Sequence, residues 1–141
     1  MADTKIQNED IARAINAFSQ NKFDEAESIC LDVLKKNNDP DANHIIGCLR
    51  MREKKFDESI DYIKKAIKDQ PENLGFHASL GCAYSSIGDY KKAIDSFSAV
   101  TKLDPKSSQV HFYLGEAFRQ IGEFQKSLHH SIGLMDVVEL E

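Results

Sequence analysis

The stretch "LGCAYSSIGDYKKAIDSFSAVTKLDP", residues 80–105, decides how the rest of this 141-residue chain is interpreted. Its apolar residues recur at spacings of three and four, which is the period of a helix and not of a strand. Two glycines nevertheless interrupt it, Gly81 and Gly88, and Pro105 closes it. A glycine inside a helix costs about 1 kcal/mol relative to alanine, so each of these positions needs a physical reason.

The same stretch recurs along the chain at a fixed interval. Residues 46–71 and 114–139 align with it, so that Gly47, Gly81 and Gly115 fall at one position, 34 residues apart. A weaker copy, "NKFDEAESICLDVLKKNNDP", occupies residues 21–40. Self-similarity at such a period is typical of stacked repeats. The chain is therefore predicted to hold about four copies of one unit.

Each copy is predicted to form two helices joined by a tight turn. Gly88 and Gly122 follow the first helix, where a left-handed residue is needed and glycine adopts that conformation at least cost. Asn21 fills this place in the first copy and Lys54 in the second, so the turn at Lys54 is expected to be strained or differently shaped. Prolines end two of the second helices, at Pro71 and Pro105.

The three glycines inside first helices are predicted to be packing devices. A destabilising residue that recurs three times at one position implies a shared geometric need, and the simplest is a partner helix that crosses too closely for a side chain. The small residues expected on the facing helices are Ala26, Ala66 and Ala93.

The whole pattern resembles the tetratricopeptide repeat (TPR) family. Its elements are Leu or Ile before the glycine, an aromatic residue three positions on, Gly-Asp/Glu-aromatic, a small residue and a closing proline, over roughly residues 7–139. The resemblance implies an all-α fold, an α-solenoid of about four helix-turn-helix units in a right-handed superhelix. First helices would line a concave groove. One TPR domain is expected over residues 1–141, with repeats at approximately 7–39, 40–73, 74–107 and 108–141.

Composition excludes several other classes of protein. The formal net charge is −5 and charges of both signs are interspersed, which argues against a nucleic-acid binder. Apolar runs are far too short to span a membrane, and the first ten residues do not read as a signal peptide, so a cytoplasmic location is expected. The three cysteines lack C-x-x-C spacing and are expected to be reduced thiols: Cys30, Cys48 and Cys82.

Histidines are the candidates for metal binding, but their placement does not favour it. His77 and His111 lie one repeat apart, where the family usually has a large residue, so a structural role is expected. His129 and His130 are adjacent on a helix and therefore point in different directions. No metal or other cofactor is predicted.

A Cys-His nucleophile pair is the one catalytic hypothesis that the spacing permits. Cys48 follows His44 by four residues, on one helix face. A catalytic thiol also needs an oxyanion site and an orienting third group, and the sequence indicates neither. An enzyme is therefore not expected.

The groove that the resemblance implies is the more promising surface. Such a groove binds an extended peptide or a short helix through apolar anchors and a few polar groups. An ordinary solvated or inter-repeat role is the alternative for any single residue in it. The groove candidates are Ile11, Ile15, Phe18, His44, Cys48, Met51, Arg52, Cys82, Ser85, Phe112, Glu116 and Arg119.

Two specialised uses of such a groove are not predicted. Relatives that clamp the C-terminal carboxylates of heat-shock chaperones use lysine, arginine and asparagine side chains at positions that here hold Asn8, Ala12, Ile45, Gly75 and Ser79. None of these is a cation, so the clamp is absent. The asparagine ladder of sugar-transferring relatives is missing as well.

The C-terminal segment "FQKSLHHSIGLMDVVELE", residues 124–141, is more apolar than one neighbouring helix could cover. A stack of repeats usually ends in a polar capping helix. We therefore expect self-association or docking through this end, or a helix that folds back along the stack. The self-association candidates are Leu128, Ile132, Met135 and Val138.

The sequence thus predicts a non-catalytic protein-interaction module, an adaptor or scaffold that binds a peptide or helix of a partner protein in its groove. Two alternatives stay open. One is an accessory subunit that positions a transferase-type enzyme or its substrate. The other is a TPR structural protein that assembles with copies of itself. Neither nucleic acid nor a membrane is an expected partner.

Overall fold

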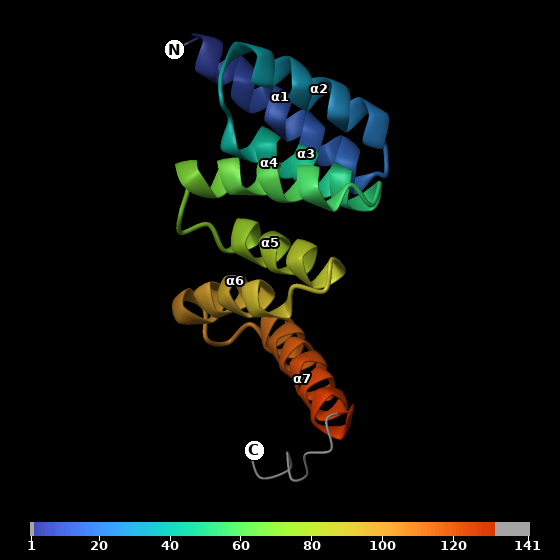
Figure 1. Cartoon of the computed structure of the whole chain (residues 1–141). Helices are drawn as coiled ribbons and strands as arrows, with labels where there is room; N and C mark the ends of the chain where they lie inside the picture. Colours follow the sequence, from blue (N-terminus) through green and yellow to red (C-terminus); the bar gives the residue numbers. More distant parts are fainter. Residues whose placement is uncertain (1, 132–141) are drawn as a thin grey trace.

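The computed structural model describes residues 2–131, with side chains for residues 4–125, and all elements in this range are α-helices (Figure 1). Apolar residues at helical spacing give each helix a face that must be buried against a neighbour. The helices are α1 (Ala2–Ser19), α2 (Phe23–Lys36), α3 (Pro40–Arg52), α4 (Phe56–Asp69), α5 (Leu74–Ser86), α6 (Tyr90–Leu103) and α7 (Ser108–Ser131).

The helices form a stack of hairpins. Each helix packs on the next one in sequence, and the first helices also touch, α1 with α3 and α3 with α5. Figure 1 shows this order from the α1–α2 pair at one end of the stack to α7 at the other. One buried apolar cluster lies among α1, α2 and α3, and a second extends from α4 to α7. This all-α solenoid confirms the predicted fold class.

The turns within the first three hairpins share one conformation. Asn21, Lys54 and Gly88 have positive φ angles of 63°, 62° and 79°. In each turn the N–H of the next residue donates to a carbonyl five positions earlier, at 2.8–3.0 Å, which is the Schellman arrangement. The turn at Lys54 therefore has the same conformation as the other two. It is strained, because a residue with a side chain rarely adopts a positive φ angle.

Two of the three predicted close crossings are present. A Cβ atom added to Gly47 would lie 2.6 Å from Cγ1 of Ile63, and one added to Gly81 would lie 2.5 Å from Cε1 of Phe97. The side chains that come closest to these two glycines are therefore large, and the small residues expected on the facing helices, Ala26, Ala66 and Ala93, are fully buried. Because each glycine lacks a side chain, a bulky side chain from the second helix fills the space beside it.

The fourth copy departs from the prediction. The chain was expected to turn at Gly122, but α7 continues through that residue to Ser131. A Cβ added to Gly115 would meet no heavy atom within 4 Å among the described residues, so the third predicted crossing is not present among them. Ser131 occupies the repeat position of Ile63 and Phe97. Because serine is too small to fill the space beside Gly115, little stabilisation is available to offset a break in the helix.

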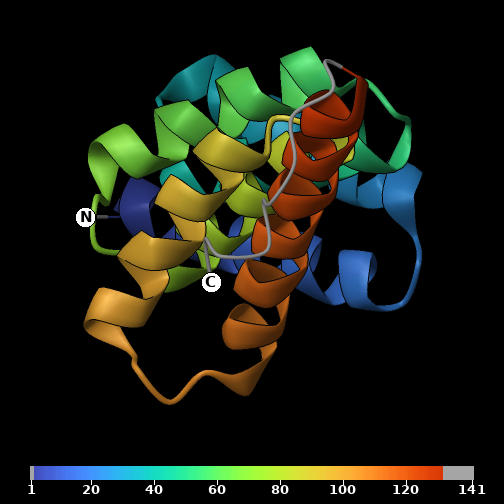
Figure 2. The ribbon, with the colours of Figure 1, turned by 60° about the horizontal axis from the view of Figure 1, so that its bottom comes forward.

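Three of the predicted self-association residues, Ile132, Met135 and Val138, lie outside the described residues, and so does the side chain of Leu128. The structure does describe α7 itself. This helix extends beyond α6 at the end of the stack (Figure 1), and in the second view it runs steeply in front of the stack (Figure 2).

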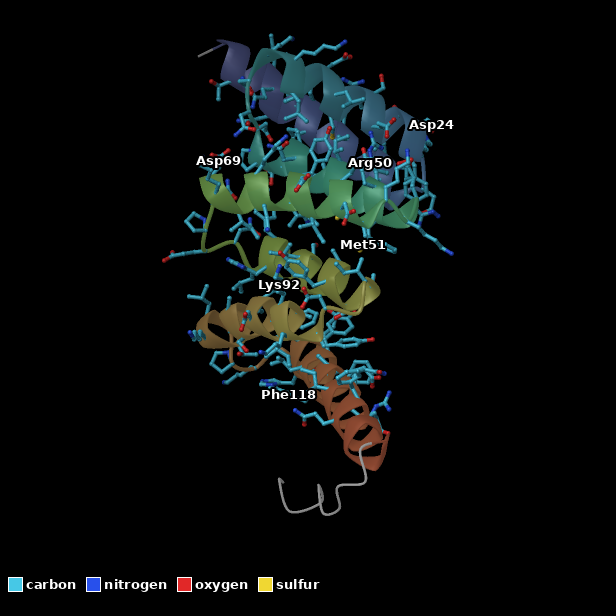
Figure 3. The ribbon with its side chains drawn as sticks, viewed as in Figure 1. Asp24, Arg50, Met51, Asp69, Lys92 and Phe118 are labelled. Carbon is cyan, nitrogen blue, oxygen red and sulfur yellow. The ribbon has the colours of Figure 1, made fainter. Side chains whose placement is uncertain are left out.

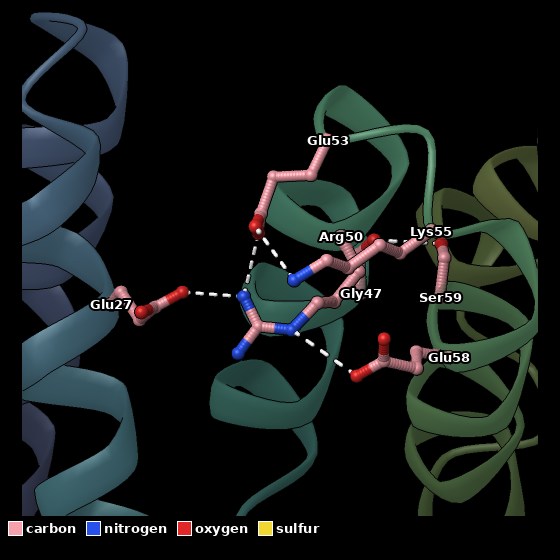
Figure 4. Close-up of polar contacts among 7 residues, drawn as sticks. All are labelled: Glu27, Gly47, Arg50, Glu53, Lys55, Glu58 and Ser59. Atoms are coloured by element: carbon pink, nitrogen blue, oxygen red, sulfur yellow. Dashed lines mark hydrogen bonds and ion pairs between the residues drawn. The ribbon is translucent and has the colours of Figure 1, made fainter.

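A cluster of charges ties the first two hairpins together (Figure 4). The guanidinium of Arg50, only 13% exposed, pairs with Glu27 of α2 at 2.5 Å, with Glu53 at 2.7 Å and with Glu58 of α4 at 3.7 Å. Its bond to Glu27 raises the pKa of Arg50 further, and its bond to Glu53 lowers the pKa of that carboxyl. Nearby, the Ser59 hydroxyl donates to the buried Gly47 carbonyl at 2.7 Å.

Candidate functional site

A concave groove crosses the first helices of the repeats, α1, α3, α5 and the start of α7. It encloses about 470 Å³ and is lined mainly by apolar or weakly polar side chains, with one charged residue among them. The residues that line it are Phe18, Cys48, Met51, Arg52, Ala78, Ser79, Cys82, Gln109, Val110 and Tyr113. We call this the concave groove.

Five of the predicted groove residues line it: Phe18, Cys48, Met51 (labelled in Figure 3), Arg52 and Cys82. Two further lining residues, Ser79 and Tyr113, were not among the groove candidates. These two residues lie 34 positions apart and so share one place in the repeat. Their common period is the signal that would have placed both in the groove.

The other predicted residues lie outside the lining. Ile11 is buried in the apolar cluster among α1, α2 and α3, which leaves little of its side chain for a partner. Ile15 and Phe112 are 52% and 68% exposed. His44, Ser85 and Glu116 are partly buried, and Arg119 is exposed.

His44, which does not itself line the concave groove, joins the lining residues Cys48 and Ser79 in a short chain of polar contacts that we call the floor. Nε2 of His44 is 2.8 Å from the hydroxyl of Ser79 on the neighbouring first helix, and 3.5 Å from Sγ of Cys48. Burial lowers the pKa of His44 to about 4 and raises that of the Cys48 thiol. Both side chains are therefore neutral near pH 7. Burial thus opposes the thiolate–imidazolium pair that a cysteine nucleophile needs, and the floor carries no charge.

Acidification is expected to destabilise the fold through His44. Its folded pKa of about 4 lies below its ordinary value of 6.5, so the unfolded chain takes up the proton first. The stabilisation is fully present above pH 6.5 and is lost as the pH falls toward 4, by about 3 kcal/mol. Urea unfolding of the wild type and of His44→Gln at pH 7 and pH 4 measures this loss. An equal pH dependence in both proteins would contradict it.

Arg52 is the charged residue of the groove lining. Its Cζ atom lies 3.8 Å from the centroid of the Phe23 ring, so that one face of the guanidinium rests on an aromatic surface. Among the described residues, no carboxylate lies within ion-pair distance of Arg52. A guanidinium positioned over an aromatic ring keeps its N–H donors available for a carboxylate.

Arg119 differs from Arg52 although both were predicted to act in the groove. It donates from Nε to Glu116 at 3.3 Å, and a second nitrogen of the guanidinium also bonds to that carboxylate. This bond lowers the pKa of Glu116. Arg119 therefore already has a carboxylate partner on its own helix.

Two other kinds of site, a metal centre and a membrane-spanning segment, are absent from the described residues. Across residues 4–125, no three His, Cys, Asp or Glu side chains are grouped so that they could hold a metal ion. None of the described helices has both the length and the apolar character that crossing a bilayer requires.

Helix hairpins stacked in series, with a groove along their first helices, define an α-solenoid of the protein-interaction class. Tetratricopeptide repeat models match residues 40–73 and 78–128, together more than half of the chain. The chain belongs to the tetratricopeptide repeat family, and its fold is that of a protein-interaction scaffold.

Solved structures of TPR proteins share this fold. An O-GlcNAc transferase mutant of Thermobaculum terrenum aligns with a TM-score of 0.78 at 20% identity, over 83% of this chain but only 23% of the transferase. The first TPR of Spaghetti (RPAP3), bound to an HSP90 peptide, gives 0.76 at 16% identity over 82% of this chain and 92% of that one. A crystal structure of MamA gives 0.74 at 17%, over 94% and 82%. No curated protein matches the chain.

Proposed function

We propose that the concave groove binds an extended peptide or a short helix of a partner protein, and that the chain serves as an adaptor or scaffold without chemistry of its own. The observation that carries the proposal is the composition of the lining. It is an apolar and weakly polar surface in which Arg52 supplies the single charge. Apolar pockets with a few placed polar groups are typical of peptide-binding grooves.

The lining also defines the chemistry of the ligand. The lining includes the small or polarizable side chains of Cys48, Ala78 and Cys82 and the flexible side chain of Met51. Methionine and cysteine adapt to differently shaped apolar side chains. A ligand with apolar residues there and an acidic residue near Arg52 would be complementary to the groove in both shape and charge. The Spaghetti domain, whose structure holds an HSP90 peptide, offers a precedent for peptide binding on this fold.

Arg52→Glu is expected to weaken binding at least about tenfold, because it replaces a charge-assisted hydrogen bond by repulsion between carboxylates. Random peptides displayed on phage would first be selected on the immobilised wild-type protein. The affinity of a selected peptide for each variant would then be measured by fluorescence anisotropy.

Arg119→Glu is the matched control, since it makes the same charge change at an exposed arginine that does not line the groove. It should leave the peptide affinity within about twofold of the wild type. Selected peptides without acidic residues, or an equal loss in both variants, would contradict the proposed role of Arg52.

A further inference from the structure

The outer face of α7 carries a depression beside a projecting aromatic ring. Gly115 and Gly122 have no heavy atom within 4 Å of an added Cβ among the described residues. Phe118, labelled in Figure 3, is 58% exposed. The spacings of three and four residues place all three on one side of the helix. We call these three residues the Gly115 face.

The earlier repeats show what such a face accommodates. Gly47 and Gly81 occupy the same repeat position as Gly115, and each receives a large apolar side chain from the next helix, Ile63 or Phe97. In the second case a phenylalanine ring lies directly over a glycine at a crossing of two helices. The chain's own residue at the corresponding place is Ser131, which is too small for this role.

We propose that a second copy of this chain covers the Gly115 face. Two α7 helices related by a twofold axis would run antiparallel, as paired helices do in the hairpins, and Phe118 of each copy would lie over Gly115 of the other. The face suits this arrangement because it carries both the ring and the depression that a ring fills. An isologous dimer requires such self-complementarity. The dimer would continue the stack, with the α7 of the partner copy in the place of a next helix.

Two variants on the Gly115 face test the proposal. Gly115→Leu fills the depression, where an added Cβ meets no described heavy atom within 4 Å, and Phe118→Ala removes a ring that is 58% exposed. Each is expected to weaken dimerisation at least tenfold in sedimentation equilibrium over a concentration series, with unchanged helicity by circular dichroism. Phe124→Ala is the matched control, since this ring is 69% exposed on the same helix but lies nine residues from Gly115, about half a turn around the helix axis. It should dimerise like the wild type.

Mixing the two variants gives the sharpest outcome. In a heterodimer of Gly115→Leu with Phe118→Ala, one contact is native, and in the other the new leucine occupies the space that the missing ring leaves. The mixture is therefore expected to form heterodimers more tightly than either variant forms homodimers. The proposal is overturned by a wild-type mass that stays monomeric at all concentrations, by a dimer that neither variant weakens, by an equal loss in Phe124→Ala, or by mixing that restores nothing.

Discussion

Gly81→Leu is expected to destabilise the protein by about 3 kcal/mol or more, at the upper end of the range for overpacked cores. The added Cβ alone would lie 2.5 Å from Cε1 and 2.7 Å from two further ring atoms of Phe97. The ring cannot move aside, because Phe97 is only 1% exposed and packs against Tyr113 on its other side. The helices α5 and α6 must therefore separate. Urea unfolding of both proteins, followed by circular dichroism, measures the loss.

Gly115→Leu supplies the control for this prediction, because it makes the same substitution at the same repeat position. No atom of the described chain lies within 4 Å of the new Cβ, and replacing a helical glycine removes a penalty of about 0.8 kcal/mol. At concentrations where the protein is monomeric, this variant should be as stable as the wild type or more so. Equal destabilisation at both positions would show that close crossing is not the reason for Gly81.

The period of the sequence predicted most of the fold because its signals are local. A glycine inside a helix and a left-handed residue at the end of that helix can each be recognised from a few neighbouring residues. Their repetition every 34 residues located three hairpins. Lys54 illustrates this well. It is a poor residue for a positive φ of 62°, yet the turn forms there because helices α3 and α4 are held together by Gly47 and Ile63.

The fourth copy could not be predicted in the same way. Its local signals, Gly115 and Gly122, match those of the other copies, but the stability of a hairpin depends on the side chain that fills the glycine from the opposite helix. That side chain is Phe97 in the third copy and Ser131 in the fourth. The pattern recorded the glycine and not the side chain that fills its space from the opposite helix.

The sequence predicted only part of the candidate site, because some of its contacts depend on how successive repeats pack against each other. Repeat position placed Cys48 and Cys82 on the concave side because they occur at one place in successive first helices. The contact between His44 and Ser79, by contrast, joins adjacent first helices with an offset of 35 residues. That offset depends on how far one repeat is rotated against the next, which a single sequence does not specify.

Phe97→Ala is expected to cost about 3 to 5 kcal/mol, the range for removing a fully buried phenylalanine. Its ring fills the space over Gly81, and it stacks on Tyr113 of α7 with centroids 5.3 Å apart. One side chain therefore holds three helices together. Because Tyr113 also lines the concave groove, the variant should lose peptide affinity along with stability. Hydrogen exchange should show the loss of protection in α5, α6 and α7, while α1 and α2 stay protected, since repeats interact only with their neighbours.

Adding Gly81→Ala to this variant separates the specific contact from general core loss. In the wild type the new methyl group would overlap the Phe97 ring at 2.5 Å and destabilise the protein. In the Phe97→Ala background the same methyl enters the cavity and improves helix propensity, so the sign of its effect should reverse. The expected coupling between the two positions exceeds about 1 kcal/mol in a double-mutant cycle. Additive effects would show that the glycine and the ring do not share the space that the structure assigns to them.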